Sequence, residues 1–250
     1  MRAVAVVPAR LASTRLPRKP LLADTGLPMV VHVLRRVMRS ASLAEVVVAT
    51  DAREIVEAVE RHGFRAIMTR SDHPTGSDRI GEVLPRLDAD VIVNVQGDEP
   101  EIAPDVIDRL VARLAEHPEL DVATAAAPLP DATRYRDPNV VKVVLNRRGE
   151  ALYFSRAPIP GHKTSDPAPT AAGRPPLQHV GIYAYRRSAL ERFLALPPSE
   201  LERTESLEQL RLLENGARYG VVEIPEAHRG IDTPSDYADF VARWFANAGN

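Results

Sequence analysis

The stretch Ala3-Val4-Ala5-Val6-Val7-Pro8 decides the fold class of this 250-residue chain. An apolar run that ends at a proline is typical of a strand buried on both faces of a sheet. Similar apolar runs lie at residues 45–49 and 91–95. Apolar residues at helical spacing follow the three runs, at residues 30–38, 52–61 and 106–114. This alternation predicts βαβ units and an α/β fold with a mostly parallel, doubly wound sheet.

The pattern changes after about residue 120. Strands are predicted at residues 122–127, 140–145, 151–154 and 179–185, with little helix between the first three. Asn146 to Gly149 is typical of a hairpin turn, and residues 161–176 are rich in loop-forming residues. Helices are expected at residues 206–215, ended by Gly216, and from Thr233-Pro234 onward. We therefore expect one domain, residues 1–250, with a smaller mixed β-rich inserted region at about 122–200.

The composition excludes several classes of protein. With 32 basic and 34 acidic residues the formal net charge is −2, whereas a general nucleic-acid binder normally carries a basic excess. The chain has no cysteine, which excludes disulfides, cysteine nucleophiles and thiolate metal sites. No apolar run approaches the roughly 20 residues of a membrane span, and the first apolar run is too short for a signal peptide. We expect a soluble, cytoplasmic protein that binds neither nucleic acid nor membrane.

The loop after the first predicted strand, Pro8 to Leu21, is basic. It carries four cations, Arg10, Arg15, Arg18 and Lys19, and no glycine. Open parallel sheets bind ligands at the carboxyl ends of their strands, and backbone N–H groups and cations there can wrap a polyphosphate. A solvated basic loop fits the same residues. Neither G-x-G-x-x-G nor G-x-x-x-x-G-K-[ST] occurs, so a nucleotide would be bound by another device.

Two carboxylates are candidates for holding a metal ion. Asp98 lies in Gln96-Gly97-Asp98-Glu99-Pro100, directly after a predicted strand. A carboxylate facing a cationic loop suits Mg²⁺, which takes oxygen ligands from the protein and from substrate phosphates. The second candidate is Asp232, which could instead help to cap the last helix. The Asp98 segment could likewise be only a polar turn.

Eight collinear blocks, covering nearly the whole chain, resemble the 3-deoxy-manno-octulosonate (Kdo) cytidylyltransferase family. They are Pro8 to Leu21, Thr69 to Arg79, Val91 to Pro100, Asp137 to Val144, Ala151 to Pro160, His179 to Tyr183, Glu205 to Arg211 and Gly230 to Pro234. Lys142, one of only three lysines with Lys19 and Lys163, lies in a matched block and is a weaker candidate site residue.

The resemblance implies a nucleotidyltransferase-like fold and the transfer of CMP from CTP to an acidic acceptor, with release of pyrophosphate and a requirement for Mg²⁺. Arg10, Lys19 and Asp98 would be catalytic, and Asp98 and Asp232 would hold the metal. The implied nucleotide-binding residues are Ala9, Ser13, Arg15, Thr75, Gly76, Arg79 and Gln96. The implied acceptor-binding residues are Arg156, His179, Tyr183, Glu208 and Gln209. The family also implies a homodimer, formed through the region after residue 120.

Three departures from the family pattern leave the acceptor open. Arg18 stands where the family usually has glycine, Gly161 where it often has tryptophan, and Pro74 to Ser77 where it usually reads Gln-Ser-Gly-Thr. Kdo is the default acceptor, and a small phosphonate such as phosphonoformate is an alternative. A non-catalytic nucleotide or sugar-acid binding protein is a further alternative, but it would be expected to lose Lys19, Asp98 or Asp232. A sugar-1-phosphate nucleotidyltransferase would normally carry a glycine-rich first loop.

Overall fold

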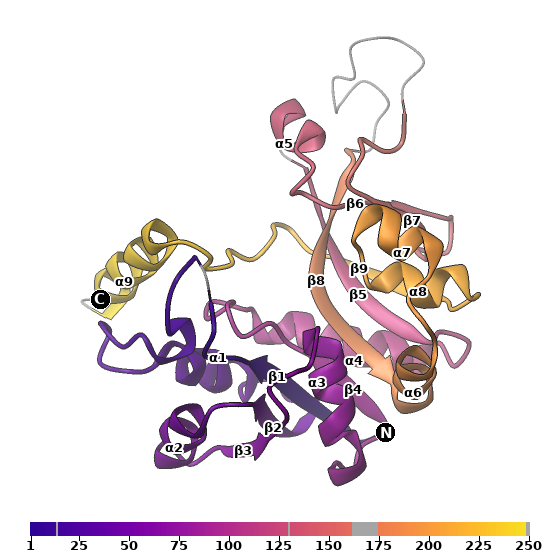
Figure 1. Ribbon diagram of the computed structural model, residues 1–250. Helices are drawn as coiled ribbons and strands as arrows, with labels where there is room; N and C mark the ends of the chain where they lie inside the picture. Colours follow the sequence, from indigo (N-terminus) through magenta and orange to yellow (C-terminus); the bar gives the residue numbers. More distant parts are fainter. Residues whose placement is uncertain (14, 130, 162–174, 249–250) are drawn as a thin grey trace. The chain divides into compact units, whose positions relative to one another are not determined.

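The computed structural model describes residues 1–13, 15–129, 131–161 and 175–248 (Figure 1). By its internal contacts the chain divides into two compact units, residues 1–108 with 228–250 and residues 109–227. The predicted inserted region of about 122–200 falls within the second unit, and the single domain stays a prediction. Most of the predicted loop at 161–176, with Lys163, lies outside the described residues.

The first unit is built on a parallel sheet. Its strands are β1 (Ala3–Ala9), β2 (Leu43–Thr50), β3 (Arg65–Met68) and β4 (Val91–Asn94), in the order β3-β2-β1-β4. Val6 of β1 lies opposite Val47 of β2 and Asn94 of β4. The sequence predicted β1, β2 and β4 because each contains an apolar run. It missed the short strand β3, which lies next to β2 at the end of the strand order and whose first and last residues are exposed.

The helices of the first unit match the predicted ones, with one addition. They are α1 (Met29–Val37), α2 (Arg53–Arg61), α3 (Gly76–Val83) and α9 (Pro234–Ala248), with the 3-10 turns η1 (Lys19–Leu21) and η2 (Leu84–Arg86). α4 (Pro104–Glu116) carries the chain from the first unit into the second. The sequence analysis missed α3, whose Gly-Ser-Asp-Arg-Ile-Gly-Glu-Val composition has no strong apolar period.

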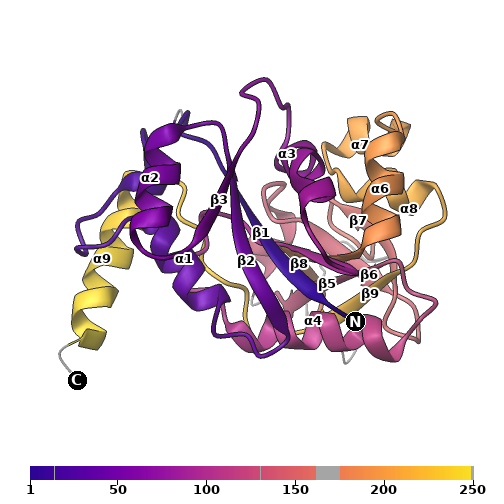
Figure 2. The same ribbon diagram turned by 90° about the horizontal axis from the view of Figure 1, so that it is seen from below.

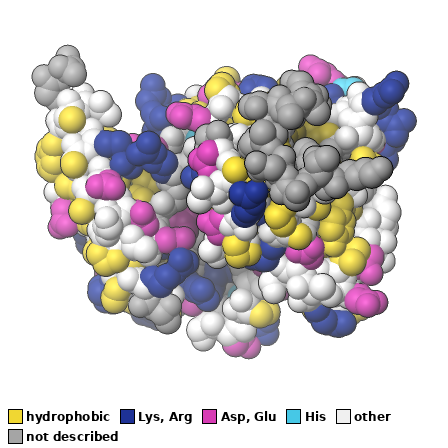
Figure 3. Space-filling view, turned by 90° about the horizontal axis from the view of Figure 1, so that it is seen from above, with side chains coloured by type: hydrophobic (Ala, Val, Ile, Leu, Met, Phe, Trp, Pro, Cys, Tyr) yellow, Lys and Arg dark blue, Asp and Glu magenta, His cyan; other side chains and the backbone are white. Residues whose placement is uncertain are grey.

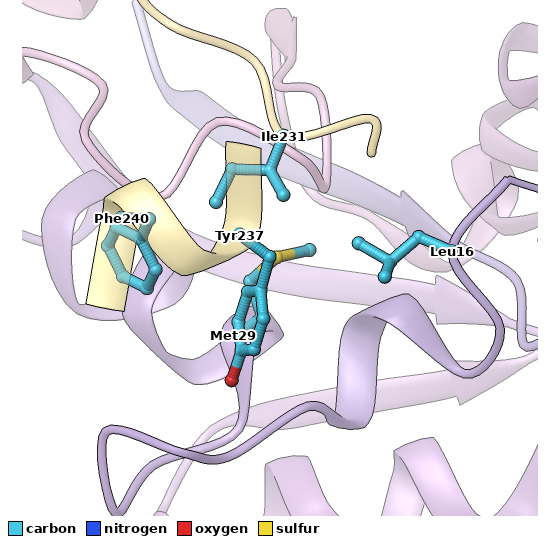
Figure 4. Packing of buried hydrophobic residues seen from close by; sticks show 5 residues of the cluster. All are labelled: Leu16, Met29, Ile231, Tyr237 and Phe240. Atoms are coloured by element: carbon cyan, nitrogen blue, oxygen red, sulfur yellow. The ribbon is translucent and has the colours of Figure 1, made fainter. Parts of the chain in front are cut away.

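The last helix returns to the first unit and packs on its N-terminal part. Tyr237 and Phe240 of α9 form a buried cluster with Leu16, Met29 and Ile231 (Figure 4). The His32 ring of α1 also meets the Phe240 ring edge-on, with centroids 5.2 Å apart. α9 lies beside α1 in both ribbon views (Figures 1 and 2). This packing ties the segment before α9 to the loop after β1.

The second unit is a mixed sheet with short helices. β5 (Val122–Pro128) lies between β8 (Leu177–Arg186), which is antiparallel to it, and β9 (Tyr219–Glu223), which is parallel to it. β6 (Lys142–Leu145) and β7 (Ala151–Ser155) form the predicted hairpin, with Gly149 at φ +73 in its turn. The helices of this unit are α5 (Ala132–Arg136), α6 (Arg187–Ala195), α7 (Glu200–Glu205) and α8 (Gln209–Glu214).

The predicted helix at 206–215 was wrong at its start. Ser206 has φ +53, which ends α7, so α8 begins only at Gln209. Its predicted end is confirmed, since α8 ends at Glu214 and Gly216, at φ +80, follows the C-cap residue Asn215. The sequence analysis also missed α5, α6, α7 and β9.

On the face shown in Figure 3, basic and acidic side chains of the described residues are interspersed. None of the helices within the described ranges combines the length and the apolar character that crossing a membrane would need.

Candidate active site

Lys19 is the centre of the site in the first unit. Its ammonium Nζ donates to Asp98 Oδ2 at 2.9 Å, to the Ile231 carbonyl at 2.8 Å and to Asp232 Oδ1 at 3.3 Å. These partners come from the loop after β4 and from the segment before α9. Only 15% of the Lys19 side chain is exposed, so the charge interactions are partly shielded from water. The sequence analysis named all three side chains, and the structure brings them together.

The sheet order explains the meeting of Lys19 and Asp98. β1 and β4 are parallel neighbours, so the loops after them leave the same edge of the sheet. Gly97 allows the loop after β4 to approach the end of β1 closely, because a Cβ there would lie 3.0 Å from the Pro8 carbonyl oxygen. The Ile231 N–H donates to the Asp98 carbonyl at 2.9 Å, which fixes the returning chain alongside.

Asp232 is not the cap of the last helix. The Asp236 carboxylate accepts from the Asp232 N–H at 3.0 Å and from the Thr233 N–H at 2.8 Å, and the Thr233 hydroxyl accepts from the Asp236 N–H at 3.2 Å. This reciprocal pair satisfies the N-terminus of α9. The Asp232 carboxylate is left to face Lys19.

The other cations of the loop after β1 differ in their surroundings. Arg15 Nη2 lies 3.1 Å from Asp232 Oδ1, so Arg15 belongs to the same cluster. Arg18 pairs with Glu54 at 3.2 Å, with both side chains more than half exposed. Arg10 is exposed. The Ser13 hydroxyl accepts from the Leu16 N–H at 3.4 Å, which helps to shape the loop.

The remaining predicted nucleotide-binding residues lie near the carboxyl ends of the first unit's strands. Thr75 caps α3 by accepting from the Asp78 N–H at 3.2 Å. A Cβ on Gly76 would lie 3.2 Å from Pro8 Cγ, so this helix start approaches the end of β1 closely. Ala9 is the last residue of β1. Gln96 donates to the Asn94 side chain at 3.5 Å.

Arg79 is buried and holds strand ends together. Its guanidinium donates to Asp51 Oδ2 at 3.0 Å, to the Arg70 carbonyl at 3.1 Å and to the Thr69 hydroxyl. These partners directly follow β2 and β3, so Arg79 fixes the base of the loop that leads to α3. A buried ion pair of this kind becomes costly when one partner is removed.

The predicted acceptor residues belong to the second unit, and two of them lie on β8. The rings of His179 and Tyr183 are 5.3 Å apart. The Thr124 hydroxyl lies 2.8 Å from His179 Nε2 and 2.8 Å from the Ile182 carbonyl, at a register shift between β5 and β8. Desolvation lowers the pKa of His179 from 6.5 to about 3, and desolvation raises the pKa of Tyr183 above its usual range. Both rings are therefore neutral at pH 7.

Arg156 is held by backbone carbonyls. Its guanidinium donates to the carbonyls of Glu205, Pro138 and Ser206 at 2.7, 3.0 and 3.2 Å. The Glu205 carboxylate in turn accepts from the Arg156 N–H at 2.9 Å and from the Ser155 hydroxyl at 2.6 Å. Glu205 is a residue of this cluster that the sequence analysis did not name, although it opens one of the matched blocks.

The last two predicted acceptor residues, Glu208 and Gln209, come shortly after Glu205 and Ser206, whose carbonyls hold Arg156. Glu208 precedes α8, and Gln209 is its first residue and is buried. The Gln209 carbonyl accepts from the Tyr219 hydroxyl at 3.0 Å. The negative charge of Glu208 contributes, after desolvation, to the raised pKa of Tyr183. The second unit therefore brings Glu208 near the β8 pair.

Lys142 is fully buried and donates only to backbone among its described contacts. Its ammonium reaches the carbonyls of Asp137 at 3.0 Å, Val140 at 2.6 Å and Arg156. Burial lowers its pKa, because desolvation disfavours the charged form. In the structure, the Lys142 ammonium joins the 137–140 turn to the backbone of Arg156.

Known proteins resemble the chain along almost all of its length. A family model described as Cytidylyltransferase matches residues 4–224. The 3-deoxy-manno-octulosonate cytidylyltransferase of Syntrophotalea carbinolica is 49% identical, covering 94% of this chain and 96% of that protein. The protein of the same name from Nitrobacter hamburgensis is 51% identical, covering 94% of this chain and 90% of its own. The chain belongs to the 3-deoxy-manno-octulosonate cytidylyltransferase family.

Solved structures agree with the family. The structure of CMP:2-keto-3-deoxy-manno-octonic acid synthetase complexed with CTP has a TM-score of 0.92 and 43% identity, covering 99% of this chain and 100% of that one. A nucleotidyl transferase from Methanothermobacter, at a TM-score of 0.59 and 21% identity, covers 98% of this chain and 99% of its own and shows the shared fold alone. The mixed α/β, mostly parallel fold class is confirmed. The phosphonate acceptor and the non-catalytic binding protein find no support.

The backbone at Arg18 leads to a prediction of stability. Arg18 has φ 56 and ψ 25, a left-handed conformation that side chains disfavour and glycine tolerates. We expect Arg18→Gly to raise the free energy of unfolding by about 1 kcal/mol, since the exposed Glu54 pair that it loses is worth little. Urea unfolding measures the change. Arg18→Ala is the matched control, because it removes the ion pair and keeps the strain. Equal stability of the two variants would contradict the prediction.

The lowered pKa of His179 predicts a pH dependence. The unfolded chain binds a proton at this residue below pH 6.5, whereas the folded chain does so only near pH 3. The contribution of neutral His179 to the free energy of unfolding is therefore complete above pH 6.5, and it is lost as the pH falls towards 3. Between pH 7 and 5 wild type should lose roughly 1–2 kcal/mol more than His179→Asn, in urea unfolding at the two pH values. Parallel losses in the two proteins would show that His179 is not the cause.

The contacts of Lys142 predict a large effect of its removal. Lys142→Met leaves three backbone carbonyls without their donor, and we expect the free energy of unfolding to fall by about 3 kcal/mol. The control is Arg192→Met, which removes a half-exposed cation that pairs with Asp121 in the same unit. Its loss should stay below about 1 kcal/mol. Similar values for the two variants, measured by urea unfolding, would refute a special role for Lys142.

Proposed function

We propose that the chain transfers CMP from CTP to 3-deoxy-manno-octulosonate and releases pyrophosphate. The observation that carries this proposal is the cluster of Lys19, Asp98 and Asp232 at the carboxyl ends of the parallel strands. It lies in a chain 43% identical, over 99% of its length, to a synthetase complexed with CTP. The carboxyl edge of an open parallel sheet is where such folds hold nucleotides.

The reaction asks the protein mainly for positioning and for neutralisation of charge. An acceptor hydroxyl oxygen forms a bond to the α-phosphorus of CTP and releases its proton to solvent, and the bond from that phosphorus to the oxygen bridging to the β-phosphate breaks. Arg10, Arg15 and Lys19 lie in the loop after β1, and they stabilise the charge on the departing pyrophosphate. The neighbouring backbone of Ala9, Ser13, Thr75 and Gly76, with Gln96, is assigned to binding the nucleotide.

Asp98 and Asp232 are assigned to Mg²⁺. The two carboxylates already converge on one cation, the Lys19 ammonium, and oxygen donors are the ligands that Mg²⁺ prefers. When bound, Mg²⁺ supplies charge neutralisation and polarises a phosphate oxygen. Lys19 then keeps the Ile231 carbonyl as a partner, which holds its ammonium at the site while phosphates compete for it.

The acceptor is assigned to the second unit. His179 and Tyr183 are neutral and offer hydrogen-bonding groups to the hydroxyls of a sugar acid, with Glu208 and Gln209 on the following segment. Arg156 supplies positive charge for the acceptor carboxylate, held in place by three carbonyls.

We also propose that the protein is a cytoplasmic homodimer. The cytoplasmic location is proposed because CTP is a cytoplasmic nucleotide. The dimer is proposed because Leu152 on β7 is 59% exposed, as a residue of a subunit interface would be in one isolated chain.

Removal of the Asp98 carboxylate tests this proposal. With CTP, Mg²⁺ and Kdo, wild type is expected to release pyrophosphate, and Asp98→Ala to reduce the rate by about 10³-fold or more while its thermal transition stays cooperative. The control is Asp105→Asn, which neutralises an exposed carboxylate at the start of α4. Asp105→Asn should release pyrophosphate at the wild-type rate. Wild-type turnover by Asp98→Ala would refute the role of Asp98, and absence of release by wild type would refute the acceptor.

A further inference from the structure

The segment 228–232, which carries Asp232, is held by hydrogen bonds at His228 and at Ile231, and the two residues between them are exposed. His228 is partly buried, Arg229 and Gly230 are exposed, and Ile231 is 1% exposed. At one anchor, Ile231 bonds through its N–H to the Asp98 carbonyl and through its carbonyl to Lys19. At the other anchor, His228 Nε2 lies 3.3 Å from the Ala103 backbone nitrogen. The position of Asp232 therefore depends on what holds His228.

The Ala103 contact fixes the protonation of the His228 ring. A backbone N–H can only donate, so Nε2 accepts and carries no proton. In the neutral ring the proton is then on Nδ1. Nδ1 lies 3.7 Å from Glu99 Oε2, and the two side chains are only 10% and 12% exposed.

Glu99 Oε2 and His228 Nδ1 are buried atoms without a hydrogen-bond partner among the described residues. One is an acceptor and the other, by the argument above, a donor, and they face each other. The gap is slightly too long for a direct hydrogen bond and closes with a small side-chain rotation. Glu99 adjoins Asp98, and its carbonyl accepts from the Ile102 N–H at 3.2 Å, so it shapes the turn from Glu99 to Ala103.

We propose that His228 is a positioning residue that fixes segment 228–232 to the turn 99–103. Its ring joins Ala103 at one end of this turn to Glu99 at the other, and so sets the Asp232 carboxylate opposite Lys19 and Asp98. The inference rests on the proposed function, because its consequence is a preformed pair of carboxylates for the divalent cation. Groups that orient metal ligands commonly change metal affinity by about 10- to 100-fold.

Three substitutions at His228 separate its two contacts. His228→Gln keeps an acceptor near the Nε2 position for Ala103, and His228→Asn keeps a donor near the Nδ1 position for Glu99. His228→Leu loses both. The control is His62→Gln, which removes an imidazole bonded to the Ala58 carbonyl at the end of α2. Asp232→Asn tests the metal assignment itself.

The measurements are Mn²⁺ binding to each protein with CTP, followed by electron paramagnetic resonance, the thermal midpoint, and the ¹⁵N signals of the His228 ring. We expect the Nδ1–H tautomer at pH 7, Mn²⁺ affinity lowered about 10-fold or more by His228→Leu and less by the Gln and Asn variants, and no change in the control.

An Nε2–H tautomer would overturn the proposal. So would wild-type Mn²⁺ affinity in His228→Leu with only a lower thermal midpoint, which would make the role structural. If Asp232→Asn weakens Mn²⁺ binding while all His228 variants bind normally, only the positioning role fails. If Asp232→Asn also binds Mn²⁺ normally, the proposed metal site itself has failed, and the positioning role falls with it.

Discussion

The first unit depends on the three hydrogen bonds of the Lys19 ammonium. They join the loop after β1 to Asp98 and to Ile231 and Asp232, which are 212 and 213 positions further along the chain. Two carboxylates that lie this close would repel one another without a cation between them. The ammonium therefore specifies the closure of the unit as well as the chemistry of the site. The parallel pairing of β1 and β4 makes this closure short.

The last helix is part of the site because of how it starts and what it covers. Thr233 and Asp236 cap this helix, so Asp232 lies outside the helix and its carboxylate does not serve as the cap. Its Tyr237 and Phe240 bury apolar surface in the cluster that also contains Leu16, on the same loop that carries Lys19 (Figure 4). Burial of aromatic surface in such a cluster stabilises both segments at once. The packing of α9 therefore also places Asp232 at the site. This link explains why the chain returns to the first unit after residue 227.

The sequence predicted those features that depend on local pattern. Continuous apolar runs predicted β1, β2 and β4. The resemblance of the matched blocks that contain Lys19, Asp98 and Asp232 implied that these three residues belong to the site. Features that depend on burial could not be read in this way. Nothing local in the sequence shows that Arg79 is buried against Asp51 or that backbone carbonyls hold the Arg156 guanidinium. Likewise, no sequence rule gives Ser206 its positive φ, so the start of α8 was misplaced.

The two lysines within the described ranges show why lysine was kept in an arginine-rich chain. An ammonium has three N–H donors that diverge from one point, and both lysines use all three. Lys19 meets two carboxylates and a carbonyl, and Lys142 meets three carbonyls. A guanidinium spreads its donors over the edge of a plane, which suits the distributed carbonyls around Arg156 but not acceptors converging on one atom. The geometry of the acceptors, more than the sign of the charge, therefore decides which cation each position needs.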